Sequence, residues 1–143
     1  MPRISRKKTR ELLMQLLYRM ALFDEYTEET KTAFLAEYAE EHPDEEPDSA
    51  YFDPIFSRIT ERLESVDNAI SGASDNWKIH RISKVDLSIL RIAASEILYE
   101  PDIPTGVSVN EAVELAKKYG SDNSPRFVNG ILGNIARGCA KTD

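Results

Sequence analysis

Cysteine is nearly absent from this sequence of 143 residues, since Cys139 is the only one. An internal disulfide is therefore excluded, and a reducing compartment is expected. Long apolar runs are also lacking, because no stretch approaches the roughly 20 apolar residues that span a bilayer. The basic start leads into residues 12–19, which contain polar side chains and no small-residue cleavage site, so the pattern does not favour a signal peptide. We expect a cytoplasmic protein with no membrane partner.

Motifs for catalysis or metal binding are lacking as well. The two histidines, His42 and His80, lie far apart, and neither has metal-ligand spacing with Cys139. The sequence contains no glycine-rich phosphate loop and no nucleophile motif. We therefore expect no metal, no cofactor and no enzymatic activity.

Strand patterns are missing too, because apolar and polar residues alternate only in the short run at 105–109. Apolar residues instead recur at three- and four-residue spacing, which predicts helices. The sequence predicts an all-α fold of about seven helices in a single domain over residues 1–143. The expected helices cover 5–23, a segment after Thr27, a segment capped by Ser49, 66–70, a strongly apolar segment opened by Ser83, and two segments within 107–135.

The last two expected helices meet at a short loop. Ser108, with Glu111 three residues on, is a good cap for the first, and Gly120 is expected to end it in a left-handed conformation. Ser124 is expected to cap the second, with Pro125 at its first position. The bend gathers two rings, an amide and a cation, which suit single-stranded nucleic acid because bases stack on aromatic rings and phosphates bind arginine. These residues are Tyr119, Asn123, Arg126 and Phe127.

The net charge of −7 hides a strong asymmetry along the chain. Residues 24–64 hold fourteen acidic side chains against three basic ones. The first ten residues hold five cations and no anion, and we expect this basic start to face water. Because an acidic protein repels nucleic acid except at a local basic patch, any RNA contact should include these cations, although a solvated tail is the alternative. The five cations are Arg3, Arg6, Lys7, Lys8 and Arg10.

Three parts of the sequence together resemble a known family. They are Arg10-Glu11 with Gln15-x-Leu17-Tyr18, then Val85-Asp86-x-x-Ile89-Leu90-Arg91-Ile92-Ala93-x-x-Glu96, and finally 109–117 with Phe127-Val128-Asn129-Gly130-Ile131-Leu132. This pattern is similar to that of the NusB family, the bacterial factors of transcription antitermination and ribosomal-RNA biogenesis. The acidic region between residues 25 and 60 carries almost none of it.

The resemblance implies an all-helical fold of two packed subdomains, here expected at about 1–76 and 77–143. It also implies a protein that binds the boxA element of ribosomal-RNA leader transcripts together with NusE, a small-subunit ribosomal protein. The complex of the two then joins elongating RNA polymerase and other Nus factors. No catalysis is implied.

Carried over residue by residue, the resemblance assigns two surfaces. The RNA surface comprises the basic start, Gln15, Tyr18, Tyr119, Asn123, Arg126 and Phe127. The partner surface rests on the acidity of the chain together with the family's NusE partnership: a basic partner is expected beside the first helix and the central apolar helix, at Glu11, Tyr18, Arg91 and Glu96. The sequence departs from the family at Asn123, where the family often has an acid.

Periodicity alone supports simpler interpretations of several of these residues. Tyr18, Tyr119 and Phe127 have the spacing of core-edge packing, and Arg91 and Glu96 suit a structural ion pair as well as partner contacts. Trp77 is expected to fill a core or interface position.

The competing function is a helical protein-interaction module whose acidic segment docks a basic partner without direct RNA binding.

Overall fold

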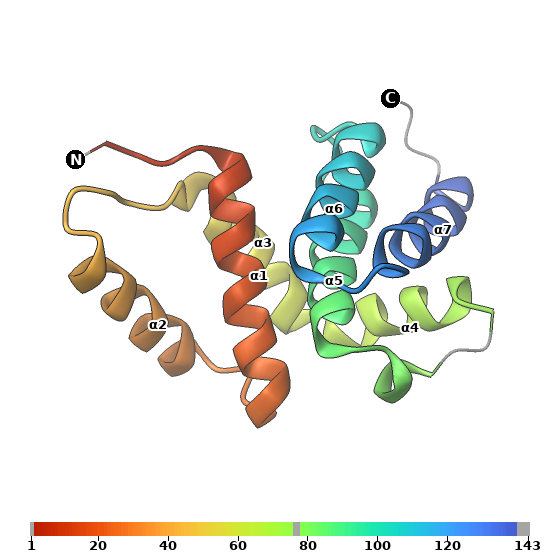
Figure 1. Cartoon of the computed structure of the whole chain (residues 1–143), viewed down its shortest axis with the longest axis horizontal. Coiled ribbons are helices and arrows are strands. Elements are labelled where there is room, and N and C mark those ends of the chain that lie inside the picture. The colour runs from red at the N-terminus through yellow and green to blue at the C-terminus, as the bar shows by residue number, and fades with distance from the viewer. Residues whose placement is uncertain (1, 76–77, 140–143) are drawn as a thin grey trace.

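The computed structural model describes residues 2–75 and 78–139, and within these ranges the chain forms seven α-helices (Figure 1). A short 3₁₀ turn, η1 (Ile79–Arg81), precedes the fifth helix. The predicted all-α fold of about seven helices is confirmed, while Trp77 lies outside the described residues. The helices are α1 (Arg6–Phe23), α2 (Glu28–Glu41), α3 (Ser49–Glu61), α4 (Leu63–Ala73), α5 (Lys84–Tyr99), α6 (Thr105–Tyr119) and α7 (Ser124–Arg137).

Side-chain caps begin three helices where the sequence predicts a start. Ser5, Thr27 and Ser83 each accept a hydrogen bond from the amide three residues on, at 3.1–3.2 Å. A cap of this kind stabilises a helix by about 1 kcal/mol. The start of α3 differs by one residue from the prediction, because Asp48 holds the cap position and Ser49 is the first helical residue.

The predicted caps around the loop between α6 and α7 are wrong in detail. Because α6 begins at Thr105, Ser108 lies inside the helix and is buried. Gly120 has a φ of −91°, which is not left-handed; a Cβ atom there would lie 2.5 Å from the Ser124 side chain, so close packing excludes one. Ser124 is the first residue of α7, and its hydroxyl accepts from the Ser121 amide instead of capping the helix.

The helix α5 forms the centre of the fold. Every residue from 86 to 97 is buried, so the helix is covered on all sides rather than along one stripe. It packs against α1, α3, α4, α6 and α7. The expectation that this helix is the buried centre is confirmed.

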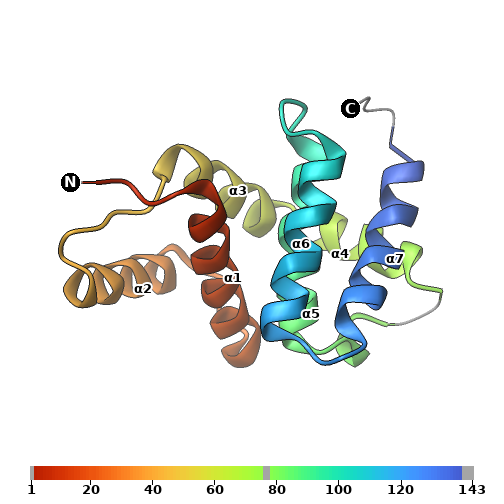
Figure 2. The same cartoon turned by 45° about the horizontal axis from the view of Figure 1, so that its top comes forward.

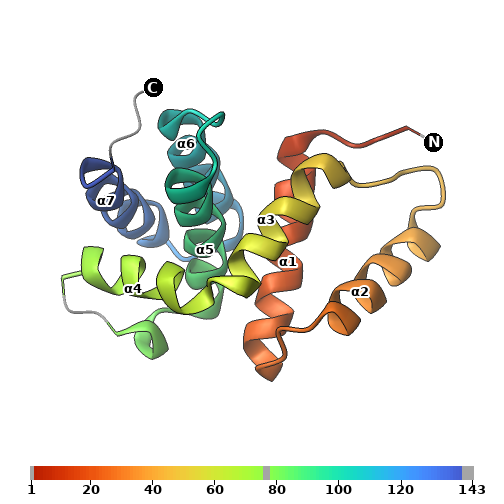
Figure 3. The same ribbon diagram turned by 180° about the vertical axis from the view of Figure 1, so that it is seen from behind.

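The other helices lie on two sides of α5. Figures 1 and 2 show α1, α2 and α3 on one side and α4, α6 and α7 on the other. Figure 3 shows α3 crossing α1 and leading into α4, with Arg62 alone between the two helices. The boundary near residue 76 stays a prediction, and α4, which precedes it, packs against both α5 and α7.

A buried ion pair joins the two sides. Arg10 of α1 donates to the Glu96 carboxylate of α5 from Nε at 2.8 Å and from Nη2 at 3.1 Å. Tyr51 of α3 and Ser108 of α6 donate their hydroxyls to the same carboxylate, the second at 2.7 Å. Glu96 is 0% exposed and Arg10 is 4% exposed. Since a buried charge is tolerated only when it is paired and hydrogen-bonded, these four residues fix four helices in one arrangement.

We predict that Glu96→Ala lowers the free energy of unfolding by about 3–5 kcal/mol, because the Arg10 guanidinium is then buried without its partner. Lys7→Ala is the control, since Lys7 is exposed three residues before Arg10 and its ion pair with Glu111 is worth about 1 kcal/mol or less. Urea denaturation of both variants measures the difference. Equal stabilities would contradict the structural role of the pair.

Candidate nucleic-acid interface

The basic start divides into exposed and buried cations. Arg3, Arg6, Lys7 and Lys8 are exposed, as predicted. The expectation that Arg10 also faces water is wrong, because helical periodicity places it on the stripe of α1 that packs against α5. Burial acts to lower the pKa of Arg10, but the hydrogen bonding to Glu96 and the charge interactions with Tyr51, Glu96 and Glu111 together outweigh burial and raise the pKa. Arg10 is a structural cation and has no surface to offer a phosphate.

The residues before α1 are held against the acidic loop that follows α2. The Ile4 amide donates to the Glu46 carbonyl at 2.9 Å, and the Glu46 amide donates to the Pro2 carbonyl at 3.1 Å. The Asp48 amide donates to the buried Thr9 hydroxyl at 3.1 Å. These contacts fix the position of the exposed cations, so the basic start is not a free tail.

One carboxylate connects α1 to the carboxyl-terminal end of α6. Glu11 accepts a hydrogen bond from Lys118 Nζ at 2.8 Å and another from the Tyr119 hydroxyl. Gln15 Nε2 donates to the Tyr119 hydroxyl at 3.3 Å, and Lys7 pairs with Glu111 at 3.4 Å. Lys7, Glu11 and Gln15 follow at four-residue intervals, so their side chains share one face of α1 and reach side chains of α6.

The pKa values of this cluster follow from its contacts. Partial burial acts to raise the pKa of Glu11, but the hydrogen bonds from Lys118 and Tyr119 outweigh burial and leave the pKa lowered. Burial and the hydrogen bond to Glu11 raise the pKa of Tyr119. The cluster therefore holds an ionised carboxylate beside a neutral tyrosine over the neutral pH range.

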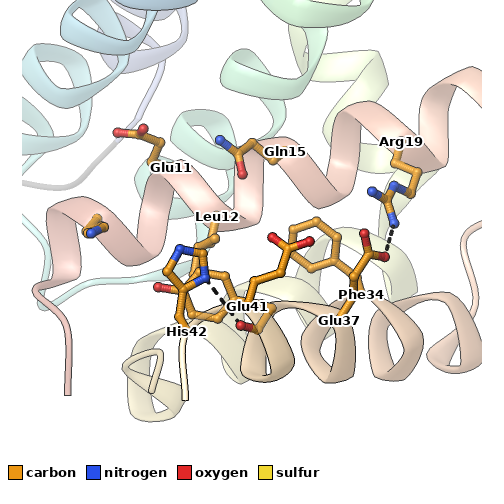
Figure 4. A pocket seen from close by; sticks show the side chains of 10 residues that line it. Glu11, Leu12, Gln15, Arg19, Phe34, Glu37, Glu41 and His42 are labelled. Atoms are coloured by element: carbon orange, nitrogen blue, oxygen red, sulfur yellow. Dashed lines mark hydrogen bonds and ion pairs between the residues drawn. The ribbon is translucent and has the colours of Figure 1, made fainter. Parts of the chain in front are cut away.

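Two hollows open along α1. The first lies between α1 and α2, where Figure 4 shows the Phe34 ring between the helices and Arg19 reaching Glu37 at 3.3 Å. The second is more apolar and shares Gln15, Arg19 and Phe34 with the first. Tyr18 and Tyr119 line the second hollow with Gln15, so the structure brings together three of the predicted site residues. The other residues that line it are Met14, Leu22, Phe23 and Val85.

The loop between α6 and α7 places the remaining predicted RNA residues. Asn123 and Arg126 are exposed. Phe127 is half-buried and packs against the core, and it lines a separate hollow with Arg126 and residues 73–75. The loop therefore exposes the Asn123 amide, and the first turn of α7 exposes the Arg126 cation and part of the Phe127 ring.

Two of the predicted partner residues are buried. The Arg91 guanidinium makes hydrogen bonds with both Asp67 carboxylate oxygens, at 2.9 and 2.8 Å, and with the Tyr26 hydroxyl at 2.8 Å. Glu96 pairs with Arg10, so the two residues form two separate structural ion pairs and not one with each other. A position for Glu96 at the rim of a partner interface is wrong, because the residue has no exposed surface.

The described parts of the chain offer no site for a metal, since within them no three His, Cys, Asp or Glu side chains are grouped to hold one. His42 stacks on the Tyr38 ring with 4.3 Å between the ring centroids. Among the helices of residues 2–75 and 78–139, none has the length and apolar character needed to cross a membrane.

Comparison with known proteins identifies the family. Residues 7–137 match the model of the NusB family. The chain belongs to the NusB family. A curated relative from Natranaerobius thermophilus, named transcription antitermination protein NusB, is 44% identical over 133 residues, which are 93% of this chain and 95% of the relative.

Solved structures of the NusB family share the fold. A structure of T. maritima NusB matches with a TM-score of 0.82 and 32% identity, over 96% of this chain and 94% of that one. A crystal structure of the antitermination factors NusB and NusE in complex with double-stranded RNA matches with a TM-score of 0.78 and 26% identity, over 93% and 96%.

Sequence patterns did not indicate several residues that hold this site in place. Lys118 follows Lys117 at the end of α6, where paired cations are ordinary because they complement the helix dipole. Thr9 is a lone polar residue within a helix, and Glu46 is one acid among many. No local pattern marks these residues, because each acts through a contact with a distant segment.

We predict that Thr9→Val loosens the basic start from the acidic loop, because the Asp48 amide loses its acceptor at a cost of about 1–3 kcal/mol. Hydrogen exchange at the Ile4 and Glu46 amides should become faster. Thr60→Val is the control, since the Thr60 hydroxyl donates to carbonyls of its own helix. Unchanged exchange at Ile4 in Thr9→Val would show that the loop does not hold the basic start.

Proposed function

We propose that this protein is a transcription antitermination factor that binds boxA RNA of ribosomal-RNA leader transcripts together with NusE. It acts in the cytoplasm as part of the RNA polymerase antitermination complex and catalyses no reaction. Membership of the NusB family supports this proposal, as does the likeness to a NusB structure solved with NusE and RNA.

The contact between α1 and the end of α6 is the main observation that supports an RNA-binding surface here. Through the Gln15–Tyr119 hydrogen bond it brings the face of α1 with Lys7 and Lys8 beside Asn123 and the first turn of α7, which bears Arg126 and Phe127. An RNA strand that follows this face meets cations first and aromatic rings next. Surfaces that bind single strands combine these two features, because cations bind the phosphates while rings stack on the bases.

The partner docks at the apolar hollow where α1 meets the start of α5. Phe23 is 68% exposed and Leu22 is 49% exposed, and they lie with Tyr18 and Val85 in this hollow. Neighbouring exposed apolar side chains mark interaction sites in soluble proteins. This hollow lies beside α1 and α5, on the side where the sequence predicts the partner. The contact residues differ from the prediction, because exposed apolar side chains would bind the partner instead of the buried Arg91 and Glu96.

We predict that affinity for boxA RNA falls with salt at a slope of roughly −2 to −3 in log–log form, if three or four exposed cations of the basic start bind phosphates at about −0.7 each. The double variant Lys7→Gln/Lys8→Gln loses two phosphate contacts, so its log–log slope should be shallower by about 1.4. Lys78→Gln with Arg81→Gln removes the same charge from exposed positions elsewhere and should leave the slope unchanged. Fluorescence titration at several salt concentrations measures the slopes, and equal slopes for both double variants would contradict the proposed site.

We predict that Phe127→Ala weakens boxA RNA binding about tenfold, because base stacking on an aromatic ring is worth about 1–3 kcal/mol. Its stability should fall by less than the roughly 3–5 kcal/mol that truncation of a fully buried phenylalanine costs, since Phe127 is half-buried. Phe127→Tyr keeps the ring and should keep most of the affinity. Melting curves beside RNA titrations distinguish the roles: a large loss of stability with unchanged affinity would assign Phe127 to packing alone.

A further inference from the structure

Glu11 is an exception in the helix that bears it. It is the one acid of α1, which also contains five cations, and it lies in the middle of the proposed RNA surface. A carboxylate on such a surface ordinarily weakens RNA binding, because it repels phosphates. The contacts of Glu11 indicate what offsets that repulsion.

The carboxylate organises two side chains of α6. One oxygen, Oε1, accepts from Lys118 Nζ at 2.8 Å and from the Tyr119 hydroxyl. The Lys118 ammonium lies 5.4 Å from the centroid of the Tyr119 ring. Gln15 supports the arrangement from α1, since it donates to the same hydroxyl at 3.3 Å. Carboxylate, ammonium and ring thus hold one another in fixed positions.

Lys118 remains available to a ligand in this arrangement. Its side chain is 60% exposed, whereas that of Glu11 is 24% exposed. An ammonium has three donors, and even with hydrogen bonds to Glu11 and Tyr119 one donor remains for a phosphate oxygen. The Glu11 carboxylate, which repels phosphates, is therefore more covered than the Lys118 ammonium, which attracts them.

We propose that Glu11 is a positioning residue for RNA binding, which holds Lys118 and Tyr119 at a fixed spacing from Lys7 and Lys8 and so strengthens binding despite its negative charge. The inference rests on the proposed function. Side chains that are ordered before binding lose less conformational freedom when RNA arrives, and this gain exceeds the repulsion of one screened carboxylate. Glu11 then belongs to the RNA surface and not to the rim of the partner interface.

The test is a boxA RNA titration with Glu11→Ala, Glu11→Gln and Glu114→Ala. Glu11→Ala should bind about fivefold more weakly, although it removes a charge that repels phosphate. Glu11→Gln keeps an acceptor for the Tyr119 hydroxyl and should keep most of the affinity. Glu114 is the matched control, an exposed acid of α6 that pairs with Lys117 at 3.8 Å, and its loss should leave affinity unchanged or slightly raised.

A double-mutant cycle separates positioning from a general loss of structure. Tyr119→Phe removes the hydroxyl and keeps the ring, so Glu11→Ala with Tyr119→Phe should bind little worse than Glu11→Ala alone. Additive losses, or a Glu11→Ala variant that binds as tightly as the wild type, would overturn this inference alone. A wild-type protein that binds no boxA RNA would overturn the proposed function and this inference with it.

Discussion

The arrangement of the helices depends on the buried carboxylate of Glu96. Its oxygens accept hydrogen bonds from α1, α3 and α6, while its own helix, α5, supplies the central packing surface. Apolar contacts are not directional and allow neighbouring helices to slide, whereas a buried charge permits only the arrangement that satisfies it. The face of α1 that meets α6 is therefore set from inside the molecule, by Arg10, before any surface residue contributes.

The sequence predicts the helices well because apolar residues recur at helical spacing and three of the helices begin at a side-chain cap. Ser5, Thr27 and Ser83 cap α1, α2 and α5, and the predominantly apolar sequence of α5 indicates its central position. The loop between α6 and α7 shows where local signals mislead. Ser108 has the pattern of a cap, yet α6 begins at Thr105, so the Ser108 hydroxyl lies inside the fold and donates to the buried Glu96 carboxylate.

The candidate site is less predictable than the fold, because it forms between segments far apart in the chain. Arg10 and Lys8 look alike in sequence, but one turns toward α5 and the other toward solvent. The same holds for Glu11, whose partners Lys118 and Tyr119 lie more than one hundred positions away. Family resemblance indicates which regions take part, and only the packing of α1 on α5, with the side-chain contacts between α1 and α6, decides how each side chain is used.

The helix α2 buries only Phe34 and Tyr38, and it packs on the outside of α1. Most substitutions on its outer surface therefore change neither the core nor the Glu96 cluster. The strongly acidic stretch of the chain includes this helix and the loop after it, where the family pattern is weakest. Evolution can thus adjust the overall charge of the protein here, and with it solubility and the repulsion of unsuitable partners, while the fold stays constant.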